Sequence, residues 1–195
     1  MHESHIHKNY DAELARLGQE LEAMGAAAAA QLEAALHALE QRDGAAAETV
    51  IAADAGIDAR ESELSHDVLR LLALRQPVAR DLREVLAALR IASDIERVGD
   101  LAANLAKRCR VLNSQPMVPA AAGLRPMADF AIRQLRDVLR AYVQRDVALA
   151  IAVRERDAEL DRLHTELFRA LLAWMAEDSS HIGGGTHLLF IAKNI

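Results

Sequence analysis

Apolar side chains recur every three to four positions along almost the whole chain, which is the spacing of amphipathic helices. A convincing alternation of apolar and polar residues, the pattern of a strand, is not found in the sequence. Pro77 fits the first turn of one predicted helix, where its missing backbone N–H costs nothing. The pattern predicts an all-α fold with six helices, at 5–42, 45–76, 78–112, 124–144, 146–177 and 186–195.

The interruptions between these helices differ in kind. The tripeptide Gln-Arg-Asp occurs at two of them, 41–43 and 144–146, and the stretch 113–126 holds three of the four prolines and is the best linker. The stretch 177–187 contains three consecutive glycines. No strand precedes them and no Lys-Ser/Thr pair follows, so we expect a flexible connection there and not a phosphate-binding loop.

The two halves of the chain resemble each other in sequence. The segment HALEQRDGAAAETVIAADAGID, residues 37–58, aligns with RAYVQRDVALAIAVRERDAELD, residues 140–161. Farther on, LRIASDI at 89–95 aligns with LFIAKNI at 189–195. The breaks between helices fall at matching points, so the repeat unit is three helices.

This repeat predicts two three-helix bundles, residues 1–113 and 114–195. The first half continues after LRIASDI with the acidic segment ERVGD, whereas the second half ends at Ile195. We therefore expect the last helix to be cut short and the second bundle to be incomplete at its C-terminal end.

Acidic residues lie on the apolar faces of three predicted helices instead of opposite them. Residues four positions apart share one face of a helix. Because an uncompensated buried carboxylate is costly, such positions need a partner or water. The acidic residues concerned are Asp54 and Asp58 in the second helix, Glu96 and Asp100 in the third, and Asp157 and Asp161 in the fifth.

One interpretation is that carboxylates from neighbouring helices converge on divalent or trivalent metal ions. Carboxylate oxygens suit Mg, Ca, Mn and Fe, and a nitrogen of His164 would favour a transition metal such as Fe or Zn. This interpretation is favoured because acidic residues recur at equivalent positions in the two halves, with Asp54 and Asp58 aligned to Asp157 and Asp161. The alternative is a solvated face on which the acids pair with nearby arginines, namely Arg60, Arg97, Arg154, Arg156 and Arg162.

Two further alternatives remain open at the level of sequence. The spacing Asp161-x-x-His164 is similar to the Glu-x-x-His arrangement of di-metal carboxylate bundles, which activate oxygen or store iron. Against this, only one such pair is present, and the first half has Glu61 at the position of His164. The other alternative is a helical scaffold that binds no ion.

Charge and cysteine content narrow the classes of function. The formal net charge of −6 and the isoelectric point of about 5.7 argue against nucleic acid as the main partner, because phosphate backbones need a basic surface. The single cysteine, Cys109, excludes an internal disulfide and fits a reducing compartment. No stretch is apolar enough for a membrane span or a signal core. We expect a cytoplasmic protein whose first residues, with His2, His5 and His7, are solvated.

Two long segments resemble the PhoU family of phosphate-specific transport accessory and regulatory proteins. These are RLLALRQPVARDLREVLAALRIASDIERVGDLAANLAKR at 70–108 and DAELDRLHTELFRALLAWMAEDSSHI at 157–182. The R-Q-P turn, the E-R-x-G-D segment and the M-x-E-D helix end occur in the order of the family. Lys107 departs from the family, which often has an acidic residue at that position.

The resemblance implies a fold of two pseudo-symmetric three-helix bundles with metal bound through E/D-x-x-x-D motifs. Glu96 and Asp100 would form one metal site with Asp54 and Asp58, and the second motif would supply half of another site, Asp157 and Asp161. The resemblance also implies a non-enzymatic adaptor that represses phosphate-starvation signalling. Its expected partners are the ATPase subunit of the phosphate ABC transporter and a membrane sensor histidine kinase, which would be its only link to the membrane. Exposed helical faces make a homodimer an expectation too.

Overall fold

The computed structural model describes residues 2–75 and 79–195, and the side chains of 12–75 and 81–195. Within these residues there is no strand, so the all-α prediction is confirmed. Gln76, Pro77 and the side chains of the N-terminal histidines lie outside the described part. The helices are α1 (His2–Gln41), α2 (Gly44–Arg75), α3 (Ala79–Leu112), α4 (Leu124–Gln144), α5 (Val147–Glu155), α6 (Asp157–Glu177) and α7 (Ile182–Asn194), with short 3₁₀ turns η1 (Pro119–Gly123) and η2 (Ser179–His181).

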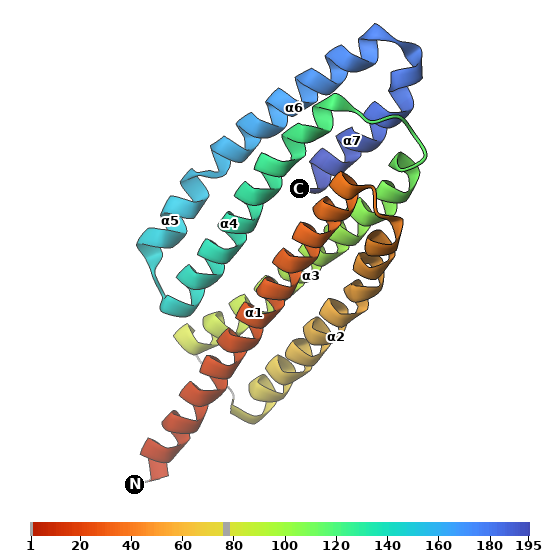
Figure 1. Ribbon diagram of the computed structural model, residues 1–195. Helices are drawn as coiled ribbons and strands as arrows, with labels where there is room; N and C mark the ends of the chain where they lie inside the picture. The colour runs from red at the N-terminus through yellow and green to blue at the C-terminus, as the bar shows by residue number, and fades with distance from the viewer. Residues whose placement is uncertain (1, 76–78) are drawn as a thin grey trace.

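The helices pack as an elongated bundle (Figure 1). α1, α2 and α3 pack against one another, α4 packs along α1, and α7 lies against both α6 and α3. α5 and α6 follow the side of α4 that faces away from α1 and α2. None of the helices in the described part of the chain is long and apolar enough to cross a bilayer.

The repeated Gln-Arg-Asp tripeptide ends one helix and starts the next. Arg42 and Arg145 adopt a left-handed backbone with φ of 55° and 54°, which stops α1 and α4. The following aspartates cap the next helix: the Asp43 carboxylate accepts from the backbone N–H groups of Ala45 and Ala46, and Asp146 accepts from Leu149. One tripeptide therefore builds the same reversal in both halves.

The helix predicted at 146–177 is divided at Arg156, so that prediction was wrong in one respect. The Arg156 N–H is shared between the carbonyls of Ala152 and Val153, at 3.3 and 3.2 Å. The Val153 carbonyl also accepts from Nε2 of Gln134 on α4, at 2.9 Å. Two donors outside the regular α-helical pattern thus bind this carbonyl at the point where α5 ends and α6 begins.

The expected flexible glycine connection was also wrong, because the three glycines form the start of α7. Gly184 and Gly185 are buried. A Cβ on Gly184 would lie 3.2 Å from Cγ2 of Val118, and one on Gly185 would overlap the side chain of Met175. Glycine is needed here for the close approach of α7 to α6 and the linker, and not for flexibility.

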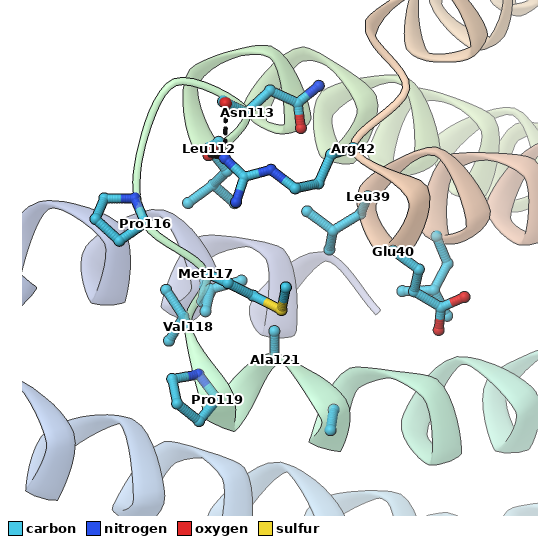
Figure 2. A pocket seen from close by; sticks show the side chains of 13 residues that line it. Leu39, Glu40, Arg42, Leu112, Asn113, Pro116, Met117, Val118, Pro119 and Ala121 are labelled. Atoms are coloured by element: carbon cyan, nitrogen blue, oxygen red, sulfur yellow. Dashed lines mark hydrogen bonds between the residues drawn. The ribbon is translucent and has the colours of Figure 1, made fainter.

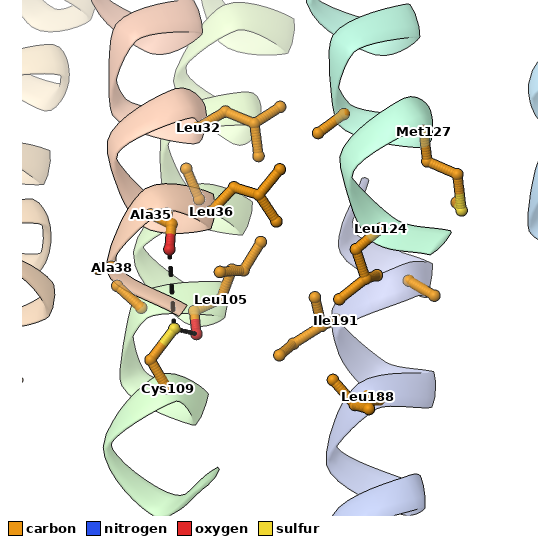
Figure 3. Close-up of a cluster of buried hydrophobic side chains, with 14 of the residues drawn as sticks. Leu32, Ala35, Leu36, Ala38, Leu105, Cys109, Leu124, Met127, Leu188 and Ile191 are labelled. Carbon is orange, nitrogen blue, oxygen red and sulfur yellow. Dashed lines mark hydrogen bonds between the residues drawn. The ribbon is translucent and has the colours of Figure 1, made fainter. Parts of the chain in front are cut away.

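The larger hydrophobic core crosses between the two halves of the chain. Leu36 of α1 and Leu105 of α3 meet Leu124 of α4 and Ile191 of α7 in one cluster (Figure 3). A second cluster lies toward the other end of the first three helices and also takes in Leu139 of α4. The two sequence halves therefore share hydrophobic cores. The predicted domain boundary at 113/114 stays a prediction that rests on the sequence repeat.

Cys109 belongs to the larger core as a free, buried thiol. Its Sγ donates to the carbonyl of Leu105 at 3.3 Å and lies 3.7 Å from that of Ala35 (Figure 3). Burial raises the pKa of this thiol to about 12. The thiolate is the reactive form, so Cys109 is a packing residue and not a nucleophile.

Candidate functional site

Four of the predicted site residues face one another across the contact between α2 and α3. Asp54 and Asp58 are one turn apart on α2, and Glu96 and Asp100 are one turn apart on α3. Asp54 and Glu96 are half-buried, whereas Asp58 and Asp100 are exposed. The helical spacing that predicted these pairs thus places the four acids close together where α2 packs against α3, and we call these four residues the acidic groove.

The acids of this groove repel one another. Burial raises the pKa of Glu96, and the charges of Asp100, Asp58, Glu61 and Asp54 raise it further. The pKa of Asp54 is raised chiefly by burial and also by Asp100 and Asp58; a hydrogen bond from Gln31 and the charge of Lys107 act in the opposite direction. The groove therefore favours a cation or a proton.

Local arginines do not neutralise the acidic groove. In the part of the chain whose side chains are described, neither Arg60 nor Arg97 forms an ion pair, although both were candidates to balance these acids. The positive charge of Lys107 acts on Asp54 from a distance, and its Nζ donates a hydrogen bond to Oδ1 of Asn104 at 3.4 Å. The alternative of a face balanced by its own arginines is therefore not favoured for the first half.

Gln31 of α1 closes the inner end of the groove, and the sequence analysis missed it. This side chain is only 6% exposed, and its Nε2 donates to the Val50 carbonyl and to Oδ1 of Asp54, each at 3.2 Å. Its Oε1 is buried and has no hydrogen-bond partner among the described residues. Gly99 lies beside it: a Cβ there would be 3.2 Å from Oε1 of Gln31 and 3.3 Å from Oδ1 of Asp54.

The oxygen atoms that the groove offers as ligands fit a hydrated, hard cation. The available ligand atoms are carboxylate oxygens and one unpartnered amide oxygen, which α3 approaches closely because residue 99 is glycine. Among the described side chains, no three His, Cys, Asp or Glu residues come together as a ligand set. Mg²⁺ is commonly held by one or two carboxylates and several waters, whereas a Zn or di-iron centre requires a fuller set of protein ligands.

The acids of the second motif have different surroundings. Asp157 and Asp161 lie in the first two turns of α6 and are exposed. The neighbouring Arg162 pairs with Glu159 and Glu166 and thus with neither aspartate. His164 stacks against Phe168 with ring centroids 6.2 Å apart. The structure does not bring these two aspartates to the acidic groove, because α6 lies on the other side of α4 (Figure 1).

A cavity of about 310 Å³ lies where the end of α1 meets the linker. Figure 2 shows the side chain of Met117 directed into it, toward Leu39 and Ala121. Its two charged residues are already engaged: Nη2 of Arg42 donates to the carbonyls of Leu112, Asn113 and Gln115, and Glu40 accepts from Arg125. The cavity is therefore an apolar space with a structural rim and not an anion site.

A comparison with protein families decides which family the chain represents. The PhoU domain model matches residues 21–109 and 124–195, which covers both halves. The chain belongs to the PhoU family. The resemblance read from the motifs at 70–108 and 157–182 is thereby confirmed.

Relatives within the PhoU family cover nearly the whole chain. The phosphate-specific transport system accessory protein PhoU homolog of Xylella fastidiosa strain 9a5c is 52% identical over 191 residues, which cover 98% of this chain and 80% of that protein. The homolog of the same name from Caulobacter vibrioides strain NA1000 is 41% identical over 192 residues, with 98% and 84% covered.

Solved PhoU structures share the fold. The crystal structure of PhoU from Pseudomonas aeruginosa has a TM-score of 0.89 and 28% identity, and covers 95% of this chain and 89% of that one. The phosphate transport system regulatory protein PhoU from Streptococcus pneumoniae has a TM-score of 0.85 and 29% identity, with 95% and 87% covered. In this chain the acidic groove lies on α2 and α3 of that fold.

Proposed function

We propose that this chain is an accessory protein of phosphate transport that works as a regulatory adaptor. The observation that carries the proposal is the PhoU domain match across both halves, supported by relatives that are named phosphate-specific transport accessory proteins. The adaptor is not an enzyme: it acts by contact, and it represses phosphate uptake and phosphate-starvation signalling when phosphate is plentiful.

The partners that we propose are the ATPase subunit of the phosphate ABC transporter and the cytoplasmic part of the sensor histidine kinase. The chain would work in the cytoplasm, reach the membrane only through these partners, and form a homodimer. Apolar side chains on its surface support a role in binding other proteins, since Leu69 and Leu74 of α2 are 62% and 73% exposed and Met117 is 76% exposed.

The adaptor role is tested in a host that lacks its own PhoU-family gene and carries a reporter of phosphate starvation. In phosphate-replete medium the wild-type chain should restore repression of the reporter. Leu74→Asp should weaken repression and the capture of the kinase or the ATPase subunit, because it places a charge on an exposed apolar position. Ala73→Asp is the matched control, a charge at an adjacent exposed position. Soluble wild-type protein without repression and without capture of either partner would rule the proposal out.

We further infer that the acidic groove binds a hydrated divalent cation, Mg²⁺ or Mn²⁺ in preference to Fe or Zn. The mutual repulsion of the four acids and the unpartnered Oε1 of Gln31 support this inference. Bound there, a cation would offset the repulsion and join α2 to α3. Asp157 and Asp161 would supply part of a second site of the same kind.

Metal content measured by elemental mass spectrometry, on protein purified without a His tag or chelator, tests the cation site. The wild type should retain close to stoichiometric Mg or Mn after soaking and desalting, and the Glu96→Ala/Asp100→Ala variant should lose it. The Asp157→Ala/Asp161→Ala variant is the matched control and should keep the ion of the groove. Equal metal content in the wild type and the groove variant would show that these acids hold no ion.

A further inference from the structure

Two buried glutamines occupy equivalent positions in the two halves of the chain. Gln31 lies on α1 and Gln134 on α4, and the alignment that pairs residues 37–58 with 140–161 also pairs these two residues. Each donates Nε2 across to the next helix, Gln31 to the carbonyl of Val50 at 3.2 Å and Gln134 to that of Val153 at 2.9 Å. These two valines are equivalent as well. The repeat therefore preserves a contact as well as a sequence pattern.

Both glutamines leave the same atom without a partner. Oε1 of Gln31 and Oε1 of Gln134 are buried and accept no hydrogen bond from the described residues. Turning either amide round would not help, because its oxygen would then meet the oxygen of a valine carbonyl. A buried acceptor without a donor is unfavourable, so each of these oxygens needs a donor that the described residues do not supply.

In the first half, the unpartnered oxygen lies beside the acidic groove. The same Nε2 that binds Val50 also binds Oδ1 of Asp54, so the amide fixes the orientation of the first acid of the groove. Gly99 of α3 packs closely against both oxygens, because a Cβ at this position would lie 3.2 and 3.3 Å from them. A buried acceptor and an anionic oxygen are thus adjacent at the inner end of the groove.

We propose that Gln31 is a member of this cation site, orienting Asp54 through Nε2 and accepting, through Oε1, a hydrogen bond from a water bound to the cation. The proposal rests on the cation site proposed above and adds a third helix, α1, to it. A hydrated cation is the ligand that fits, because its waters are strong donors and its charge matches the acids around them. Gln31 would then couple α1 to the ion that joins α2 and α3.

The test is Mn²⁺ affinity of the full chain, measured by electron paramagnetic resonance and checked with Mg²⁺ by calorimetry. Gln31→Leu keeps the approximate volume and removes both polar atoms, and it should weaken Mn²⁺ binding by roughly 10- to 100-fold, as loss of such supporting partners does. Gln134→Leu is the matched control. It removes the equivalent amide from the second half and should change the affinity of the groove by less than about twofold.

A conservative variant separates a role at the ion from a role in packing. Gln31→Glu keeps an oxygen at the Oε1 position and loses the donor to Asp54, so it should bind Mn²⁺ more tightly than Gln31→Leu does while lowering stability in cation-free buffer. If Gln31→Glu loses binding as fully as Gln31→Leu, or if Gln31→Leu binds as tightly as the wild type, Gln31 is a packing residue and the proposal is wrong.

The Glu96→Ala/Asp100→Ala variant distinguishes this failure from failure of the site itself. Binding that is lost in that variant but unchanged in Gln31→Leu would leave the cation site standing and remove Gln31 from it. A wild-type chain that binds neither Mn²⁺ nor Mg²⁺ would overturn both. Circular dichroism on each variant shows that the protein under test is folded.

Discussion

The two halves of this protein carry the same acidic motif on different supports. In the first half, α2 runs unbroken through Asp54 and Asp58, and Gln31 binds Asp54. In the second half, the helix is divided at Arg156, Gln134 binds Val153, and Asp157 begins α6 as an exposed residue. There the acid lies at a helix N-terminus, where a negative charge is favourable without any bound ion. The same motif thus lies within a continuous helix in the first half and at a helix N-terminus in the second.

The third helix of the first half supplies the opposing charge. α3 carries Glu96 and Asp100 opposite Asp54 and Asp58 of α2. Negative charge therefore accumulates where α2 packs against α3. This accumulation, and not the presence of Asp-x-x-x-Asp by itself, favours a cation at the acidic groove.

The largest effect should come from breaking the core that the halves share. Leu36 is 1% exposed within the cluster that joins α1 and α3 to α4 and α7. Leu36→Ala should lower the free energy of unfolding by about 2–5 kcal/mol, because it leaves a cavity in a packed core. Urea unfolding followed by circular dichroism measures this loss. A single transition that moves as a whole is expected, and two separated transitions would show that the halves unfold independently.

A smaller effect is expected from replacing two helical glycines, one of which lies beside the acidic groove. Gly56→Ala on α2 meets no atom within 4 Å and should stabilise the protein by roughly 1 kcal/mol, since alanine favours helix over glycine. Gly99→Ala has the same helical gain but brings a Cβ to 3.0 Å from Ile57 and 3.2 Å from Gln31. Its stability should fall below that of Gly56→Ala, and its Mn²⁺ affinity should fall below that of the wild type. Thermal unfolding and Mn²⁺ titration of both variants check this, and equal behaviour would contradict the close packing at Gly99.

The smallest effect is on pH dependence, which should have opposite signs in the two halves. The pKa of Glu96 is raised above its ordinary value of 4.5, so the folded chain binds more protons there than the unfolded chain, and stability falls as pH rises through that window. The pKa of Glu159 on α6 is lowered by Arg162, so its contribution is present above pH 4.5 and is lost as pH falls through the lowered folded pKa.

Single variants in cation-free buffer separate these two contributions. Glu96→Gln should raise stability at pH 7 by a few tenths of a kcal/mol, the usual size of a like-charge pair on a helix, and should flatten the fall in stability as pH rises above 4.5. Glu159→Gln should leave that fall in place and remove only the loss on further acidification. Denaturant unfolding across pH measures both, and a Glu96→Gln variant less stable than wild type at pH 7 would contradict the repulsion described for the groove.

Much of the architecture could be predicted, because helical periodicity reports directly on which residues are buried. The helices expected at 5–42 and 124–144 are within a few residues of α1 and α4. The break at Arg156 could not be predicted, because it depends on a bond from Gln134 that only the tertiary structure forms. The glycines at the start of α7 signalled a loop, yet their role is close packing against Met175, which a single sequence does not show.

The charged residues of the candidate cation site could be predicted from the sequence, whereas its neutral residue, Gln31, could not. Asp54 and Glu96 stood out because acids on an apolar stripe are unusual. Gln31 did not stand out, since a glutamine in an alanine-rich helix is ordinarily solvated. The signal was nevertheless present in the repeat, where Gln31 aligns with Gln134.

The burial of Cys109 makes the molecule suited to spectroscopy. Since its thiol is enclosed and its pKa is raised to about 12, maleimide and methanethiosulfonate reagents have almost no thiolate to attack at neutral pH. A cysteine introduced on the outer surface of α2 and another on α6 would therefore carry spin labels or fluorophores without removal of the native residue. The distance between the two halves can then be followed as Mn²⁺ or a partner protein is added.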